Sequence, residues 1–170
     1  MNENLTVRKA TYADLPALMA IYDHARAYMR ENGNMEQWDG GYPQITVIEE
    51  DISLGRCHIC MDGDEIAGVF CFFKGNDPTY AKIYDGAWLN DKPYGVIHRI
   101  AVVRHGVGVA SFCFDYAFAA CGNVKIDTHR DNIPMQSALS KNGFARCGII
   151  YLQNGDPRIA YQNSLDAEGK

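Results

Sequence analysis

The sequence has no cluster of basic residues and no long apolar run. Its 170 residues include 16 Lys and Arg against 21 Asp and Glu, for a net charge of −5. Nucleic-acid binding relies on clustered basic side chains, so the scattered ones here predict no DNA or RNA partner. No stretch approaches the roughly 18 uncharged apolar residues of a membrane span, and the N-terminus lacks the basic-then-apolar pattern of a signal peptide. We therefore expect a cytoplasmic protein that does not bind membranes.

The chain also lacks internal repeats, low-complexity tracts and any segment that looks like a linker. A length of 170 residues falls within the usual range of one domain. We predict a single domain over residues 1–165 and a flexible C-terminal tail over 166–170.

The cysteines lie mostly inside apolar runs, where a free thiol behaves as a small hydrophobic group. Cys57 and Cys60 have the spacing of a metal or redox motif. They lie in an expected strand, however, where residues three apart point to opposite faces. We therefore expect reduced cysteines and no bound metal. The six are Cys57, Cys60, Cys71, Cys113, Cys121 and Cys147.

Apolar spacing in the first half of the chain predicts a strand, two helices and a hairpin. The strand covers 5–10, the first helix opens at Thr11 and Asp14 and ends at Gly33, and strands over 56–62 and 65–74 form the hairpin. The second helix is predicted to run to Gly55 because Thr46 and Glu49 have capping-box spacing.

The second half follows a strand–helix–strand order after a long polar connection over residues 75–94. A strand over 94–103, a helix over 106–121 and a strand over 124–129 form a βαβ unit, whose strands are parallel. A helix over 132–142 follows, and strands over 145–153 and 158–163 form a hairpin that turns at Asn154-Gly155. The pattern predicts a mixed α/β fold.

Residues 100–110 carry the strongest functional signal, because a strand there passes through Gly106 and Gly108 into a helix. Glycines let the backbone approach a ligand, and the amides at a helix N-terminus bind phosphate oxygens. The segment lacks the ending of a P-loop and is incomplete as a Rossmann fingerprint. It is either a diphosphate site or a purely structural turn.

The segment HGVGVA resembles the pyrophosphate loop of the GNAT N-acetyltransferase superfamily, usually written Q/R-x-x-G-x-G/A. Gly108 and Ala110 stand at the last two defining positions, and His105 stands where Gln or Arg is usual. Downstream, residues 131–136 and 141–144 resemble that superfamily's Asn-headed helix and its closing Gly-Phe. The resemblance is specific from about residue 94 to 161, and the order of the upstream elements agrees with it.

The resemblance implies a single-domain α/β fold whose mixed central sheet has a splayed parallel strand pair, over 95–103 and 124–129, flanked by helices. The pantetheine arm of acetyl-CoA, the co-substrate, enters between the splayed strands. The cofactor-binding residues that it implies are backbone groups of Ile100, Ala101 and Val102 for the arm, amides of His105, Gly106, Val107, Gly108, Val109 and Ala110 for the pyrophosphate, and Asn132.

The implied activity is acetyl-CoA-dependent N-acetyl transfer by direct attack of an amine in a ternary complex. The amine must lose a proton, and His98 is the first candidate for the base because histidine titrates near neutrality. The alternative is a structural histidine. Asp127 and His129 lie two apart on the neighbouring strand and so share a face. They are candidates to hold or relay the ammonium proton, or else are solvated residues at a strand end.

The thiolate that leaves needs a proton, and the usual donor is missing. The superfamily often has a Tyr five residues before its Gly-Phe phenylalanine, where this chain has Leu139. Another hydroxyl, such as that of Ser140 or Tyr151, or water must then serve. The missing Tyr keeps open a non-catalytic acyl-CoA-binding sensor or regulatory domain. A transferase for another acyl-CoA or for an oxygen nucleophile is a third alternative.

Aromatic residues beside carboxylates predict the acceptor pocket, because they suit a cation with an apolar body. Trp38, Tyr42 and Trp88 are the predicted substrate-binding residues, and Glu36, Asp39 and Asp85 lie near them in sequence. We expect a small amine or an amino-acid-like acceptor. The alternative is that these aromatics only cover the open end of the sheet. Exposed aromatics and an edge strand in the C-terminal hairpin also leave a homodimer open.

Overall fold

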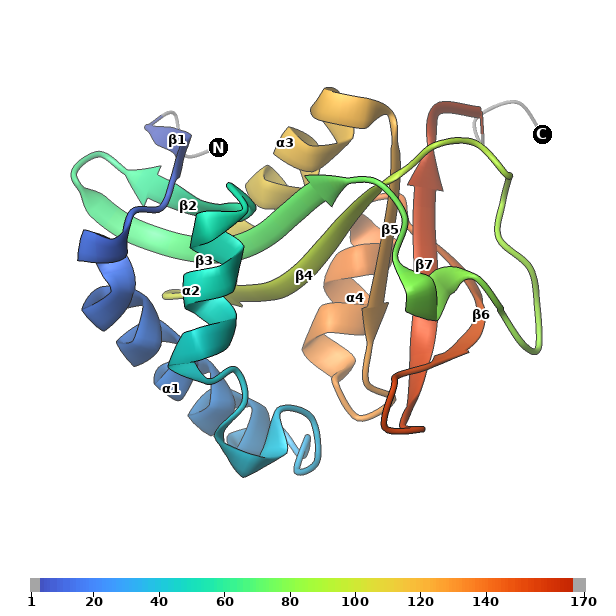
Figure 1. Cartoon of the computed structure of the whole chain (residues 1–170), viewed down its shortest axis with the longest axis horizontal. Helices are drawn as coiled ribbons and strands as arrows, with labels where there is room; N and C mark the ends of the chain where they lie inside the picture. The colour runs from blue at the N-terminus through green and yellow to red at the C-terminus, as the bar shows by residue number, and fades with distance from the viewer. Residues whose placement is uncertain (1–3, 167–170) are drawn as a thin grey trace.

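The computed structural model describes residues 4–166 and contains the predicted alternation of strands and helices (Figure 1). The predicted tail at 166–170 lies outside these residues apart from Asp166. The elements in chain order are β1 (Leu5–Lys9), η1 (Tyr12–Asp14), α1 (Leu15–Glu31), η2 (Asp39–Gly41), α2 (Ile45–Ser53), β2 (Cys57–Asp62), β3 (Glu65–Lys74), η3 (Pro78–Tyr80), β4 (Gly95–Val102), α3 (Val109–Cys121), β5 (Asn123–Thr128), α4 (Ile133–Lys141), β6 (Ala145–Tyr151) and β7 (Pro157–Ser164).

The strands form a mixed seven-stranded sheet in the order β1-β2-β3-β4-β5-β7-β6. Strands β4 and β5 are parallel, as the βαβ pattern predicts, and the other neighbours are antiparallel. The C-terminal hairpin places its second strand, β7, against β5. The mixed α/β fold with a parallel central pair is thus confirmed.

The parallel pair separates soon after it begins. Gly95 pairs with Val124 and Val96 with Lys125, and neither strand pairs with the other beyond that point. On its other side β4 carries an irregularity, because Cys71 pairs with His98 while Val69 pairs with Ala101. Arg99 inside this bulge has a φ of 49°, which is left-handed. The sheet is therefore open between the carboxyl-terminal halves of β4 and β5.

Helices cover both faces of the sheet, with α1 and α2 on one face and α3 and α4 on the other (Figure 1). Val69 packs with the α1–α2 core, and the next residue, Phe70, packs with the α3–α4 core, as alternation along a strand requires. Cys57 and Cys60 divide between the same two cores, as their spacing predicts, and all six cysteines are free thiols. None of the helices within residues 4–166 is long and apolar enough to span a membrane.

The connection between β3 and β4 covers the outer edge of β6. Tyr84 exchanges two hydrogen bonds of 2.8 Å with Ile149, and the amide of Ala87 donates to the carbonyl of Cys147 at 2.9 Å. Gly86 is required there, because an added Cβ would lie 1.9 Å from the Cys147 carbonyl oxygen. The edge strand predicted in the C-terminal hairpin is therefore partly shielded from other chains.

Two predicted helix starts are wrong. Helix α2 begins at Ile45 with Gln44 as its N-cap, so Thr46 is already helical and does not cap the helix. Helix α3 begins at Val109 instead of Gly106, because Gly106 and Gly108 have φ values of 76° and 85°. A right-handed helix cannot continue through left-handed residues.

Candidate functional site

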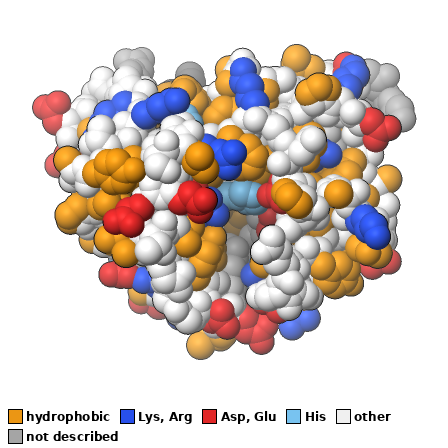
Figure 2. Space-filling model, viewed as in Figure 1, with side chains coloured by type: hydrophobic (Ala, Val, Ile, Leu, Met, Phe, Trp, Pro, Cys, Tyr) orange, Lys and Arg blue, Asp and Glu red, His pale blue; other side chains and the backbone are white. Residues whose placement is uncertain are grey.

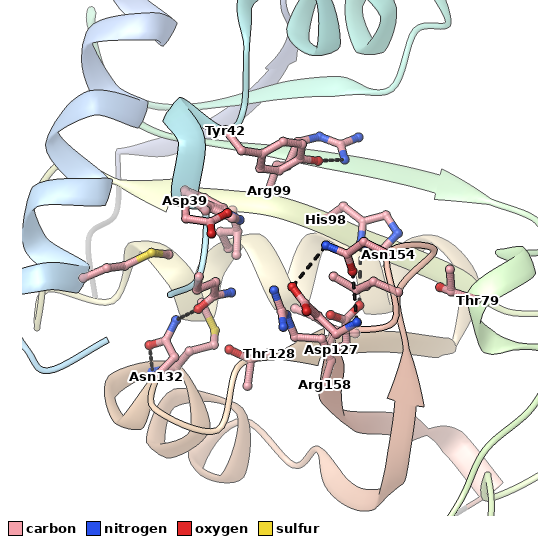
Figure 3. Close-up of a pocket in the computed structure, with 18 of the residues that line it drawn as sticks. Asp39, Tyr42, Thr79, His98, Arg99, Asp127, Thr128, Asn132, Asn154 and Arg158 are labelled. Carbon is pink, nitrogen blue, oxygen red and sulfur yellow. Dashed lines mark hydrogen bonds and ion pairs between the residues drawn. The ribbon is translucent and has the colours of Figure 1, made fainter. Parts of the chain in front are cut away.

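A cavity of about 670 Å³ opens where β4 and β5 separate. Its walls come from residues 37–44, from Asp77 and Thr79, from the middle of β4, from the end of β5 and from the β6–β7 turn. Figure 2 shows this face of the molecule hollowed near its centre, and Figure 3 shows the side chains that line the cavity.

His98 lines the cavity and is held by a carboxylate that lies far from it in sequence. Its Nε2 is 2.6 Å from Oδ2 of Asp77. The other oxygen of Asp77 accepts hydrogen bonds from the amide and hydroxyl of Thr79, at 2.8 and 2.6 Å. Burial raises the pKa of Asp77, but the hydrogen bonds from His98 and Thr79 outweigh it and lower the pKa to about 2. Asp77 is therefore ionised at neutral pH and fixes the Nε2–H tautomer of His98, which leaves Nδ1 as an acceptor.

Asp127 faces the free nitrogen of His98. Its Oδ1 lies 3.9 Å from His98 Nδ1 and accepts a hydrogen bond of 2.6 Å from the hydroxyl of Tyr80. Burial raises the pKa of Tyr80, and the nearby carboxylate of Asp127 raises it further, so Tyr80 stays a neutral donor. The structure thus places two of the three predicted catalytic residues, His98 and Asp127, side by side in the cavity wall (Figure 3).

His129 lies elsewhere, because β5 ends at Thr128 and the strand alternation does not extend to His129. Its Nδ1 accepts a hydrogen bond of 3.0 Å from the amide of Asp131, and its Nε2 lies 3.6 Å from Glu36. His129 does not line the cavity, so the structure does not bring it together with Asp127 there. The side chains of Glu36, His129 and Asp131 lie close enough to surround a cation. However, Nδ1 of His129 already accepts a hydrogen bond, and the ring proton is then on Nε2, so neither ring nitrogen has a lone pair for a metal.

The segment between α1 and α2 brings Trp38, Asp39 and Tyr42 to the cavity. Two arginines of α1 hold its backbone. Arg30 donates to the carbonyls of residues 34, 37 and 38, and Arg26 donates to that of Tyr42. The irregular segment is thereby fixed to a regular helix, and its aromatic rings have defined positions.

Trp88, the third residue predicted to bind the substrate, does not line the cavity. Its indole Nε1 donates to the carbonyl of Tyr80 at 3.0 Å, and the Nζ of Lys125 lies 4.1 Å from its ring centroid. Burial lowers the pKa of Lys125. Trp88 thus holds the backbone of Tyr80 through this hydrogen bond, and its ring packs on the buried Lys125. Asp85, predicted beside it, is exposed in the same connection.

Arg99 is a site residue that the sequence patterns did not indicate as functional. Its guanidinium forms two hydrogen bonds with Asp51 of α2, at 2.8 and 2.7 Å, and a third with the Tyr42 hydroxyl at 3.0 Å. Its carbonyl accepts from the Tyr22 hydroxyl at 2.7 Å. The signal available was the pair His98-Arg99 inside an apolar strand, because two consecutive polar residues break strand alternation and indicate a bulge.

The glycine loop presents an open backbone at the start of α3. An added Cβ at Gly106 or Gly108 would meet no atom within 4 Å, so a ligand can approach both. The first amides of α3, at Val109 and Ala110, have no partner inside the helix because they belong to its first turn. His105 stacks on Tyr28 with ring centroids 3.5 Å apart, which ties the loop to α1. This arrangement fits a phosphate group.

Of the remaining residues named from the sequence, Asn132 also lines the cavity, whereas Leu139, Ser140 and Tyr151 do not. Asn132 caps α4, accepting from the Met135 amide at 3.1 Å, and donates to Gln37 at 2.9 Å. Leu139 is fully buried in the core. The hydroxyls proposed in place of a tyrosine there do not line the cavity, since Ser140 is exposed on α4 and Tyr151 packs on Tyr84.

The architecture defines a class of protein. A glycine loop and helix follow the first strand of a parallel pair that parts over a cavity, and the helices cover both faces of a mixed sheet. This is the GNAT fold. No protein-family model and no curated protein matches the sequence.

Solved structures do match it. A GNAT-family acetyltransferase from Streptococcus agalactiae 2603 is 30% identical, with a TM-score of 0.88 over 95% of this chain and 96% of that one. Another from Listeria monocytogenes 4b F2365 is 20% identical, with a TM-score of 0.70 over 95% of each chain. AAC(6')-Ib, solved in complex with ribostamycin and coenzyme A, is 18% identical, with a TM-score of 0.66 over 99% of this chain and 97% of that one. The chain belongs to the GNAT family of acetyltransferases and is an acyltransferase.

Proposed function

We propose that the protein transfers the acetyl group of acetyl-CoA directly to the amine of a small or amino-acid-like acceptor in a ternary complex. The observation that carries the proposal is His98, held by Asp77 and facing Asp127, in the cavity where β4 and β5 part. Support also comes from AAC(6')-Ib, a neighbour in fold that was solved with ribostamycin and coenzyme A.

Acetyl-CoA fits the features around the splayed strands. Backbone groups of Ile100, Ala101 and Val102 on β4 have no strand partner on the β5 side and would hold the pantetheine arm. Amides of the glycine loop and the first turn of α3 would hold the pyrophosphate. The residues for this are His105, Gly106, Val107, Gly108, Val109 and Ala110, with Asn132 at the head of α4.

In this proposal, His98 and Asp127 receive the acceptor ammonium, and His98 removes its proton. Hydrogen bonds of about 2.8 Å from one ammonium nitrogen can reach both His98 Nδ1 and Asp127 Oδ1, which lie 3.9 Å apart. His98 Nδ1 then accepts the proton, and Asp77 stabilises the resulting imidazolium from the other side of the ring. The neutral amine attacks the thioester carbonyl, and the departing thiolate takes a proton from water or from the imidazolium.

The walls of the acceptor site come from the segment between α1 and α2. Trp38 and Tyr42 supply aromatic faces, and Asp39 adds a carboxylate near them. Tyr42 is held by Arg99, which is itself paired with Asp51. Such a site suits an ammonium group on an apolar body.

The proposal is tested by calorimetric titration with acetyl-CoA, followed by thiol release against a panel of small amines, polyamines and amino acids. Acetyl-CoA binding with thiol release for particular acceptors, and mass-spectrometric detection of the N-acetylated product, is the expected result. Binding without release for any acceptor would instead favour a non-catalytic acyl-CoA sensor. Absence of acetyl-CoA binding would contradict the assignment of the glycine loop.

A further inference from the structure

Arg158 is a buried cation in the cavity wall, and it has no carboxylate partner among residues 4–166. Its side chain belongs to β7, and the residue is 8% exposed. Its guanidinium donates to the carbonyl of its neighbour Pro157 at 2.9 Å, and it forms no ion pair with any carboxylate in residues 4–166. Arg99 in the same cavity is, by contrast, paired with Asp51 through two hydrogen bonds. Buried charges are normally paired, so Arg158 has unused capacity for an anion.

Thr128 is a second polar group of the cavity with unmet hydrogen-bonding capacity. The residue is 1% exposed, and its Oγ1 is a buried side-chain atom that has no hydrogen-bond partner within the described part of the chain. A buried hydroxyl that makes no hydrogen bond destabilises the protein unless a ligand or water completes it. Thr128 ends β5 and lines the same cavity as Arg158 (Figure 3).

The register of β5 and β7 places Arg158 beside the groups proposed to receive the amine. Asp127 pairs with Ala160, and Arg158 lies two residues from Ala160 on the same strand and so on the same face. Two residues of strand span about 7 Å. The cavity therefore offers a carboxylate with a histidine at one point and an unpaired guanidinium a short distance along the sheet. The two poles match the ammonium and carboxylate of one small zwitterion.

We propose that Arg158 binds the carboxylate of the acceptor, and that the acceptor is an amino acid. The inference rests on the proposed function and names its substrate class. A guanidinium binds a carboxylate through two parallel hydrogen bonds, which orients the acceptor as well as attracting it. The phosphates of the co-substrate belong to the glycine loop, whose residues do not line this cavity.

Matched acceptors measure the contribution of the acceptor's carboxylate separately from that of the rest of the acceptor. Glycine, alanine, phenylalanine and glutamate are each compared with the corresponding α-amide and decarboxylated amine, at saturating acetyl-CoA. The wild-type protein is compared with Arg158→Gln, with Arg158→Lys, and with Arg130→Gln as a control, since Arg130 is exposed and lies outside the cavity. Circular dichroism and thermal unfolding check that each variant folds.

The expected result is a wild-type preference for the free carboxylate that Arg158→Gln removes. Loss of charge-assisted hydrogen bonds predicts a fall of about 10- to 150-fold in kcat/KM for the carboxylates. The values for the amides, and KM for acetyl-CoA, stay unchanged. Arg158→Lys, which keeps the charge, retains part of the preference and serves as the test if the Gln variant does not fold. Amides and amines used as well as amino acids by the wild type would overturn the inference and leave the proposed function standing.

A binding measurement keeps the two proposals distinguishable if no acceptor is acetylated. Calorimetric titration of the CoA-saturated protein with N-acetylalanine and with its amide reads the anion site without turnover. Tighter binding of the carboxylate that is lost in Arg158→Gln supports the inference even where transfer fails. Equal binding of the two compounds, or no binding of either, overturns it.

Discussion

A single carboxylate sets the chemistry available to His98. Because Asp77 accepts from Nε2 at 2.6 Å, the other ring nitrogen is the one that can take a proton from an acceptor. Asp77 comes from the connection before β4 and is anchored by the Thr79 amide and hydroxyl. The position of the histidine ring therefore depends on a loop that lies 21 residues away in sequence.

Replacing His98 by Gln removes the proposed base while keeping a side chain of similar size. We expect kcat to fall about 100- to 10,000-fold, the contribution of a positioned general base, and the pH dependence of the rate that a general base causes to disappear. Steady-state kinetics over pH 5–9 measures both. His24→Gln is the control, since His24 is exposed on α1. An unaltered pH profile in His98→Gln would assign His98 a structural role.

Replacing Asp77 by Asn tests its effect on His98 and on stability together. The pKa of Asp77 is lowered to about 2, so its charge stabilises the fold above the unfolded-state pKa of 3.8. That contribution is lost as the pH falls from about 4 to 2. We expect wild-type stability to decline over this range and the decline to be smaller in Asp77→Asn, as urea unfolding at pH 7 and pH 3 would show.

The kinetic effect of Asp77→Asn should appear in kcat and its pH profile, with KM for acetyl-CoA unchanged, because Asp77 contacts His98 and not the glycine loop. Asp64→Asn, in the exposed turn between β2 and β3, provides the control. A variant that loses acetyl-CoA binding and turnover in equal measure would show that Asp77 acts only through folding.

At the scale of elements, the turn from β4 into α3 has a left-handed backbone and leaves room for a ligand beside it. Gly108 has a φ of 85° and would place a Cβ in open space, so a side chain there strains the backbone without striking another residue. Gly155, in the β6–β7 turn, has a φ of 88° and the same open surroundings. The two glycines therefore have the same conformation, and only Gly108 belongs to the loop that is proposed to bind the pyrophosphate.

Gly108→Leu and Gly155→Leu are therefore matched substitutions. Each should lower the free energy of unfolding by about 1–2 kcal/mol, because a side chain is disfavoured in the left-handed region. Only Gly108→Leu should abolish acetyl-CoA binding, since its side chain occupies the space that a pyrophosphate needs. Calorimetry and urea unfolding measure the two effects. Equal acetyl-CoA affinity in both variants would refute the loop assignment.

Periodicity predicted the elements well because each depends on residues close in sequence. Alternation gave β4 within one residue at each end, and the βαβ order predicted its parallel pairing with β5. The capping box at Thr46 failed because capping spacing recurs by chance and the preceding chain already supplies the helix start at Gln44. The predicted start of α3 at Gly106 failed because Gly106 and Gly108 are left-handed, a conformation that glycine adopts without the steric cost of a Cβ.

The candidate site was predictable only where its residues lie on predicted strands or in an aromatic loop. His98, Asp127, Trp38 and Tyr42, which the sequence offered as site residues, all line the cavity. The pairing of His98 with Asp77 depends on how the connection folds back, which no local pattern encodes. Trp88 lies in the same connection, so the sequence could not show that its side chain stays outside the cavity. Arg158 left a signal, because it shares a face with the apolar Ala160 on a strand whose next three residues are also buried.

At the scale of the whole molecule, the sheet consists of two parts that meet weakly. Strands β1 to β4 form one part and β5, β7 and β6 the other, and β4 and β5 are joined by two residue pairs. A ligand inserted between the separated ends of β4 and β5 would bond to both parts. Binding that is confined to the native state raises stability by RT ln(1 + [L]/Kd), about 2.7 kcal/mol at 100-fold excess over Kd.

Coenzyme A should therefore protect both sides of the opening at once. We expect slower amide hydrogen exchange in residues 97–102 of β4, in residues 126–128 of β5 and in the first turn of α3, together with a higher melting temperature. Strand β1, at the far edge of the sheet, should change only as much as global stability requires. Gly108→Leu should show none of these effects, and Gly155→Leu should show all of them. Protection limited to the glycine loop would mean that the ligand binds outside the opening, and the splayed pair would then lose its proposed role as the seat of the pantetheine arm.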